Sequence, residues 1–324
     1  MGAKKYNKEF LGELYAKMVR IRLFEEQVLE FYQYGKMPGL AHLYIGEEAV
    51  AVGACAALNP GDYAGSTHRG HGHVIAQGAD INRALAEILG KKDGLCKGKG
   101  GSMHIMDMSK GILGANGIVG GGIPIATGAA YKAKVMGTNQ AVISFFGDSA
   151  SNEGTFHESI NMAAAWKLPV VYIIENNMYG ISVGIDRVTN TENLSDRAHG
   201  YGMKGITIDG NDVLKVYETV KEALDSARSG NGPTLIECKT YRWKGHHAGD
   251  PATAYRTREE ENTWKEKCPI SGMRRYLLAG GYYTEAELDD VHAAIALEIK
   301  AAAEFAEKSP YPDPAEAYTD IFAE

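Results

Sequence analysis

The stretch AVISFFGDSASNEGTFHESINMAAAWKLPVVYIIENN, residues 141–177, decides the fold. It opens with a short apolar run at 141–146, continues through a polar loop into a helical pattern at 152–166, and closes with a second apolar run at 170–174. Two nearly continuous apolar strands joined through a helix are typical of a βαβ unit in a parallel sheet that is covered on both faces. We therefore predict an α/β fold, with a mostly parallel central sheet and helices on both faces.

The rest of the chain extends this pattern in both directions. Two more short apolar runs, 205–208 and 234–240, predict further strands. Apolar spacing of three and four residues, or richness in alanine, predicts helices at 10–32, 47–58, 126–135, 213–228 and 285–308. We expect one domain spanning 1–324, with an N-terminal helical segment at 1–60 and a C-terminal helical segment at 257–324.

Two segments are too rich in glycine for regular elements. The sequence STHRGHGH at 66–73 indicates a loop. Residues 91–122 are the most glycine-rich region, and glycine lets the backbone approach a ligand closely. A flexible linker is the alternative for 91–122, but many apolar side chains are interleaved there. We therefore favour a packed functional loop.

Composition excludes several classes of protein. Hydrophobic residues make up 44% and charged residues 23% of the 324 residues, which is ordinary for a globular protein. A net charge of -7 gives no basic face for nucleic acid or an anionic membrane. The four cysteines form no C-x-x-C pair, so we expect reduced, mostly buried thiols. Without an apolar leader or a membrane-length apolar run, we expect a cytoplasmic protein with neither nucleic-acid nor membrane partners.

Polar side chains follow the two strands of the opening stretch. Asp148 comes directly after the first strand, and Asn177 comes after the second. Ligands of parallel α/β sheets bind beyond the carboxyl ends of the strands, so both side chains are expected at one edge. Carboxylate and amide oxygens suit Mg²⁺, which usually takes few protein ligands together with phosphate oxygens. Small residues after Asp148 leave backbone N–H groups at a helix start, where phosphate is favoured.

Other interpretations of these motifs remain open at this stage. Asp148 alone could be a helix cap, and Asn177 alone could belong to a turn. The stretch GANGIVGGG at 114–122 could bind a nicotinamide dinucleotide, although it lacks a good preceding strand and the acidic residue expected about twenty positions later. Imidazoles also bind zinc, and a metal site could involve His68, His71, His73, His246 and His247, although their spacing matches no helix face.

Several blocks resemble one enzyme family. The span from Gly147-Asp148 to Asn176-Asn177 is similar to the thiamine-diphosphate motif, which runs from Gly-Asp-Gly to Asn-Asn about thirty residues later. The surrounding sequence resembles the alpha subunits of pyruvate, branched-chain 2-oxo acid and acetoin dehydrogenases. The blocks that carry this resemblance are HLYIGEEAVAVG (42–53), GKGGSMHI (98–105), GANGIVGGGIP (114–124), NEGTFHESINMAAAWKLPVVYIIENNMYGIS (152–182) and DPATAYRTREE (250–260).

The resemblance implies thiamine diphosphate and Mg²⁺ as cofactors, and it implies roles for particular residues. The metal ligands would be Asp148, the Asn177 side chain and the Tyr179 carbonyl. His246 would be the catalytic active-site histidine, near the diphosphate and the substrate channel. The other cofactor-binding positions are His68 and Arg69 near the diphosphate, Ser149 and Ala150 through their backbone N–H groups, and Gly117 and Val119 at the aminopyrimidine. Ser149 departs from the motif, which has glycine there; a positive φ would make serine costly, whereas a negative φ would keep the N–H group in place.

The resemblance also implies partners and a reaction. The chain would form a heterotetramer of two alpha and two beta subunits, with a glutamate of the beta subunit completing the active site. The enzyme would cleave a small-molecule substrate and pass a two-carbon unit to a lipoyl-bearing acyltransferase component. The sequence at 103–124 is more similar to acetoin than to pyruvate dehydrogenase alpha subunits, so acetoin is favoured. Oxidative decarboxylation of pyruvate or of a branched-chain 2-oxo acid, and a non-catalytic scaffold of the complex, are the alternatives.

Overall fold

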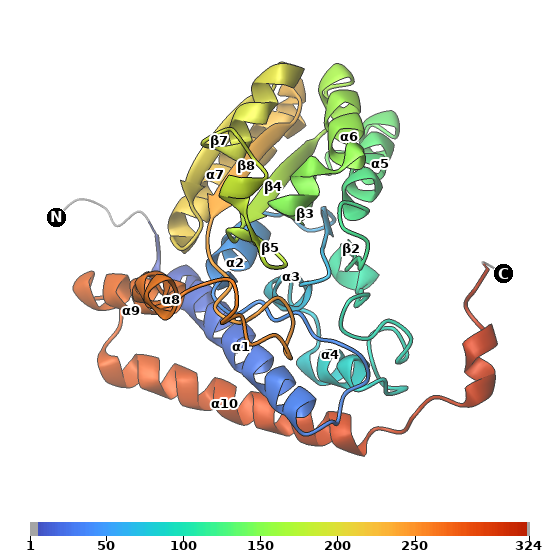
Figure 1. The fold of residues 1–324 in the computed structure, drawn as a ribbon, viewed down its shortest axis with the longest axis vertical. Helices are drawn as coiled ribbons and strands as arrows, with labels where there is room; N and C mark the ends of the chain where they lie inside the picture. Colours follow the sequence, from blue (N-terminus) through green and yellow to red (C-terminus); the bar gives the residue numbers. More distant parts are fainter. Residues whose placement is uncertain (1–5, 323–324) are drawn as a thin grey trace.

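The computed structural model describes residues 6–322 and contains a parallel sheet of six strands, in the order β2-β1-β3-β4-β8-β7 (Figure 1). Every pairing between neighbouring strands of this sheet is parallel. Its strands are β1 (Tyr63–Gly65), β2 (Ile112–Gly114), β3 (Val142–Gly147), β4 (Val170–Asn176), β7 (Lys204–Asp209) and β8 (Thr234–Lys239). Two short strands, β5 (Tyr179–Gly180) and β6 (Val183–Gly184), form an antiparallel hairpin. The predicted α/β class with a parallel sheet is confirmed.

Helices cover both faces of the sheet. Figure 1 shows α5 and α6 together on one side and α7 on the other. The helices are α1 (Lys8–Gln33), α2 (Glu48–Ala56), α3 (His71–Ala76), α4 (Ile81–Ile88), α5 (Gly122–Val135), α6 (Gly154–Ala165), α7 (Val213–Ser226), α8 (Arg258–Glu266), α9 (Pro269–Ala279) and α10 (Glu285–Lys308). None of the helices in the described part of the chain is both long and apolar enough to cross a membrane.

Two hydrophobic cores result from the alternation of side chains along the strands. In β3, Ile143 and Phe145 belong to the larger core, which also contains residues of α1, α2, α7 and α10. Their neighbours Val142 and Phe146 belong to the second core, beneath α5 and α6. Because successive residues of a strand point to opposite faces, a strand that is apolar throughout must be buried on both sides. This is the physical reason that the opening stretch predicted the layered fold.

The first and last long helices pack against each other. In Figure 1, α10 runs alongside α1 across the base of the molecule. Ion pairs join the two helices, between Arg20 and Glu298 at 3.0 Å and between Lys8 and Glu287 at 2.6 Å. Thr284 begins α10 with a capping box, in which its side chain and that of Glu287 each bind the other residue's backbone. The N- and C-terminal helical segments therefore pack together, although whether the chain is one folding domain stays a prediction.

The glycine-rich segment 91–101 is organised around one buried carboxylate. Glu87 has no exposed surface and accepts hydrogen bonds of 2.8–2.9 Å from four backbone N–H groups. The donors are Cys96, Gly98, Gly100 and Gly101. This part of the predicted functional loop is packed against the protein and is no free linker. The four cysteines are unpaired, and all except the half-buried Cys96 are buried.

The structure corrects two local predictions and adds two strands. The loop predicted at 66–73 ends early, because α3 begins at His71, where its residues are buried against Glu25 and Glu175. The helix predicted at 152–166 is preceded by a separate 3-10 turn, Ser149–Asn152, and begins at Gly154. Strands β1 and β2 were not predicted, because three residues are too few for a period-two pattern to stand out.

Candidate functional site

A cavity of about 260 Å³ opens beyond the carboxyl ends of the central strands. Strands β3 and β4 are in register from Val142 and Val170 to Gly147 and Glu175, so the residues after each strand reach the same edge of the sheet. The cavity is lined by residues from these strand ends and from the loops after β1 and β8. Nearly all the predicted site residues line it, namely His68, Arg69, Val119, Asp148, Ser149, Ala150, Asn177, Tyr179 and His246. Gly117 does not line it.

Asp148 provides a buried carboxylate at the floor of this cavity. Only 2% of its surface is exposed. Burial raises the pKa of the Asp148 carboxyl, while a hydrogen bond from the Ser149 hydroxyl and one from the Asn177 backbone partly offset the rise. No cationic side chain is paired with this carboxylate within ion-pair distance among the described residues. A bound cation would therefore relieve the cost of burying its charge.

Asn177 presents an oxygen that lacks a partner. Its Nδ2 group donates to the Glu47 carboxylate at 3.3 and 3.4 Å, which fixes the orientation of the amide. The Oδ1 atom is buried and has no hydrogen-bond partner in the described structure. Buried acceptors are normally satisfied, and each exception in a native fold calls for an explanation. An unpartnered amide oxygen that shares a cavity with the Asp148 carboxylate fits a hard divalent cation such as Mg²⁺.

The backbone around Tyr179 is strained. Met178 and Ile181 have φ values of 75° and 53°, in the left-handed region. A β-branched residue such as Ile181 is rarely found there, and strain of this kind persists where the surroundings enforce it. The β5–β6 hairpin provides one constraint, and the Tyr179 hydroxyl provides another by donating to Glu260 at 2.9 Å. These contacts hold the Tyr179 backbone at the rim of the cavity.

Ser149 is compatible with its place in the motif. It lies in the 3-10 turn Ser149–Asn152 and does not have a positive φ. The possible cost of replacing the motif's glycine therefore does not arise. Room for the side chain comes from Gly180, where an added Cβ would lie 2.1 Å from the Ser149 hydroxyl oxygen. The serine and this glycine form a complementary pair in direct contact at the cavity wall.

We expect the substitution Ser149→Gly to leave thiamine diphosphate affinity within about threefold of the original, because serine is unstrained here and only a small backbone-entropy effect remains. Gly180→Ala should weaken binding markedly, since the new methyl group meets Ser149. The double variant should recover affinity. Calorimetric titration of the original protein and the three variants measures this, and a large gain of affinity in Ser149→Gly would show that the serine is a defect.

Arg69 joins three segments at the cavity wall. Its guanidinium donates to the Leu43 carbonyl at 2.7 Å and to the His246 carbonyl at 3.0 Å. Its Nε atom lies 3.7 Å from the Glu47 carboxylate. Burial raises the pKa of Glu47 to about 8, against the opposing effect of Arg69. Arg69 therefore supplies a fixed positive charge close to the position expected for a diphosphate.

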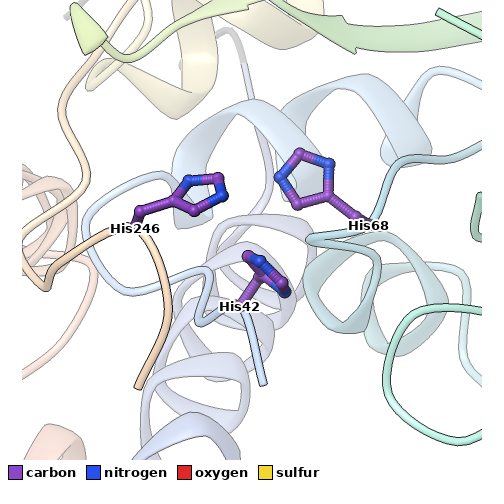
Figure 2. A group of neighbouring side chains, drawn as sticks. All are labelled: His42, His68 and His246. Carbon is purple, nitrogen blue, oxygen red and sulfur yellow. The ribbon is translucent and has the colours of Figure 1, made fainter. Parts of the chain in front are cut away.

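Three histidines from distant parts of the chain meet beside the cavity, of which His68 and His246 line it. Figure 2 shows the rings of His68 and His246 reaching toward each other, with His42 beside them. One potential ligand nitrogen from each ring lies within 4.8 Å of the others. Burial, followed by the charge of Arg69, lowers the pKa of His42 to about 2, of His68 to about 3 and of His246 to about 4. All three rings are therefore neutral at neutral pH.

His42 was not among the predicted site residues. The spacing of His42 from other residues does not distinguish it. The one feature of the sequence that could have indicated it is its position at the start of the block at 42–53. The five-histidine metal site considered from the sequence does not form. His71 instead pairs with Glu25 at 3.0 Å, and His73 pairs with Glu175 at 2.9 Å, both within the core.

Val119 and Gly117 have different surroundings. Val119 lines the cavity and is 47% exposed, as an apolar contact for a ligand would be before binding. Gly117 packs against His104 instead, where an added Cβ would lie 3.1 Å from the ring. Gly117 thus allows the 114–122 loop to approach the protein closely.

Comparisons with known proteins identify the family of the chain. The model of the family described as "Dehydrogenase E1 component" matches residues 16–315. The chain is 50% identical over 311 residues to the alpha subunit of acetoin:2,6-dichlorophenolindophenol oxidoreductase of Bacillus subtilis, covering 95% of this chain and 92% of the relative. It is 45% identical to the protein of the same name from Cupriavidus necator, covering 98% and 95%. It is 43% identical to the pyruvate dehydrogenase E1 component subunit alpha of Zymomonas mobilis, covering 97% and 89%.

Proposed function

Because this chain belongs to the dehydrogenase E1 component family, we propose that it is the alpha subunit of a thiamine-diphosphate-dependent dehydrogenase that cleaves acetoin. The observation that carries the proposal is the unpartnered Asn177 Oδ1 in the same cavity as the buried Asp148 carboxylate. A pair of hard oxygen ligands at the strand ends is what a metal-bound diphosphate requires.

Each predicted residue has a task in this proposal. Asp148, the Asn177 side chain and the Tyr179 carbonyl hold Mg²⁺. The diphosphate is bound by Arg69 and His68, and by the backbone N–H groups of Ser149 and Ala150 at the start of a turn. The loop that contains Gly117 and Val119 holds the aminopyrimidine. Thiamine diphosphate, when bound, supplies the nucleophilic carbon and the electron sink for C–C cleavage.

His246 is the catalytic residue of the proposal within this chain. Its ring lines the cavity, and burial together with the nearby charge of Arg69 lowers its pKa to about 4. A neutral imidazole can donate one hydrogen bond and accept another without bringing further charge into the site. His246 therefore positions the substrate or the incoming lipoyl arm.

A beta subunit completes the proposed enzyme. The matching relatives from Bacillus subtilis and Cupriavidus necator are named as subunit alpha, which implies a second subunit. We propose a heterotetramer of two alpha and two beta subunits, acting with a lipoyl-bearing acyltransferase. Large apolar side chains exposed on α5 and α6, such as Ile125, Val135 and Met162, support burial against another subunit.

Acetoin is the favoured substrate, and pyruvate is the second candidate. The two acetoin relatives are 50% and 45% identical to this chain, whereas the pyruvate relative from Zymomonas mobilis is 43% identical. The higher identity to the acetoin relatives makes acetoin the first candidate. Subunits with different substrates differ by few contacts, so the substrate is tested directly.

The test is reduction of 2,6-dichlorophenolindophenol by the purified chain, with and without a co-expressed beta subunit. Thiamine diphosphate and Mg²⁺ are supplied, with acetoin or pyruvate as substrate. We expect activity only with the beta subunit and a higher kcat/KM for acetoin. A higher kcat/KM for pyruvate would select the second candidate. Failure of the complex to bind thiamine diphosphate would exclude the enzyme and leave a scaffold role.

A further inference from the structure

A buried arginine contacts the ring of His246. Arg242 is 1% exposed, and its Nη1 atom lies 3.1 Å from His246 Nδ1. Its Nη2 atom donates to the Ile181 carbonyl and lies 3.4 Å from the Tyr255 hydroxyl. Contacts on several sides therefore fix the guanidinium, and through it the ring of His246.

The chemistry of this contact determines where the ring carries its proton. A guanidinium has N–H donors and no acceptor. Burial lowers the pKa of Arg242 to about 10, which still leaves it charged at neutral pH. The ring nitrogen that faces Arg242 must therefore accept, so Nδ1 is unprotonated and the proton of the neutral ring is on Nε2.

We propose that Arg242 is a positioning residue that holds His246 as the Nε2–H tautomer, so that His246 donates a hydrogen bond to an oxygen atom of the ligand in the cavity. The tautomer follows from this chain's own residues. The identity of the ligand rests on the proposed function, under which the oxygen belongs either to the diphosphate or to the carbonyl or hydroxyl group of acetoin.

This assignment argues against a metal centre at the three histidines. The potential ligand nitrogens of His42, His68 and His246 lie within 4.8 Å of one another (Figure 2). A zinc site is therefore the alternative to consider. Zinc, however, needs a free lone pair from each imidazole, at about 2.0–2.1 Å. In His246, one nitrogen accepts from Arg242 and the other carries the proton. A cation here would also face the positive charges of Arg69 and Arg242.

The same assignment argues against His246 as a general base. A base needs an unprotonated nitrogen directed at the substrate, and the unprotonated Nδ1 is directed at Arg242. Besides burial, the charges of Arg69, Arg242 and His247 lower the pKa of His246, and only Asp250 raises it. The Asp250 carboxylate forms no hydrogen bond with the ring of His246. It accepts a hydrogen bond of 2.7 Å from the backbone N–H group of His246.

Two substitutions separate these roles. The amide nitrogen of glutamine lies close to the position of histidine Nε2, whereas asparagine is shorter and reproduces the Nδ1 position. In the complete α–β complex, His246→Gln should keep kcat/KM within about fivefold, while His246→Asn should lose about 100-fold, as for the loss of one transition-state donor. The neighbouring His247→Asn is the matched control and should change little.

Titrations then identify the oxygen that accepts. If it belongs to the diphosphate, His246→Asn will weaken the binding of thiamine diphosphate itself. If it belongs to the substrate, cofactor binding will be unchanged, and the loss will appear in the kinetic constants for acetoin. Equal losses in His246→Gln and His246→Asn would overturn the donor role.

The tautomer can be observed without any activity. Nitrogen-15 solid-state spectra of the histidine-labelled complex distinguish protonated from bare imidazole nitrogens, and the difference from His246→Gln identifies the signals of His246. We expect a bare Nδ1 and a protonated Nε2, and a mixture of tautomers in Arg242→Met. A protonated Nδ1 in the native complex, or zinc binding that His246→Asn abolishes, would overturn the proposal. This measurement needs no substrate, so its result does not depend on whether the proposed reaction is correct.

Discussion

Replacing Asp148 by asparagine is expected to lower the dehydrogenase activity of the α–β complex by about 1000-fold at a fixed, moderate cofactor concentration. A carboxylate that binds a metal contributes several kcal/mol, and about 4 kcal/mol corresponds to this factor. Asparagine keeps the shape of the side chain but removes its charge. Acceptor reduction and titration of thiamine diphosphate with Mg²⁺ measure the effect.

The same substitution should not destabilise the chain without cofactor. Because burial raises the pKa of Asp148, its charged form is disfavoured in the folded protein above the pKa of the unfolded chain, so removing the charge relieves a cost. Asp225, exposed on α7 and paired with Lys221, is the matched control, and Asp225→Asn should keep full activity. An Asp148→Asn protein that binds metal and cofactor normally would contradict the assignment of the metal site.

Replacing Glu87 by alanine is expected to lower the free energy of unfolding by about 4 kcal/mol. The substitution leaves several buried backbone N–H groups without an acceptor, and each such loss costs about 1–3 kcal/mol before relaxation. Urea denaturation of the α–β complex, followed by tryptophan fluorescence, measures the change in midpoint. Cofactor affinity should also fall, because the 91–101 segment leads into the cavity loop at 114–122.

Two further variants show whether the carboxylate itself is responsible. Glu87→Gln keeps one acceptor oxygen and should lose roughly half as much stability. Glu298 is a half-exposed glutamate on α10 that pairs with Arg20, and Glu298→Ala should cost less than about 1 kcal/mol. If Glu87→Ala and Glu298→Ala had equal effects, the hydrogen bonds to Glu87 would not be what holds this segment.

The sequence predicted those features that depend on the strand pattern. Asp148 and Asn177 could be brought to one edge because the apolar runs before them identify neighbouring parallel strands, whose ends must coincide. The layered fold followed from the same runs, since a strand that is apolar throughout has both faces buried.

The missed features depend on tertiary contacts. His42 meets His68 and His246 only through the tertiary fold, and no local sequence pattern indicates this contact. The role of Glu87 was hidden for the same reason, since its backbone partners follow 9–14 residues later in a segment without periodicity. The tautomer of His246 depends on a contact with Arg242, which sequence spacing alone does not establish.

The pairing of α1 with α10 has a consequence for how the chain is made. The helix that is synthesised first, Lys8–Gln33, buries part of its apolar face against a helix that begins only at Glu285. At a ribosomal rate of about 5–20 residues per second, the early helix must wait on the order of tens of seconds for that partner. Until then only the earlier partners α2 and α3 can cover the helix, so the larger core closes only when synthesis is nearly complete.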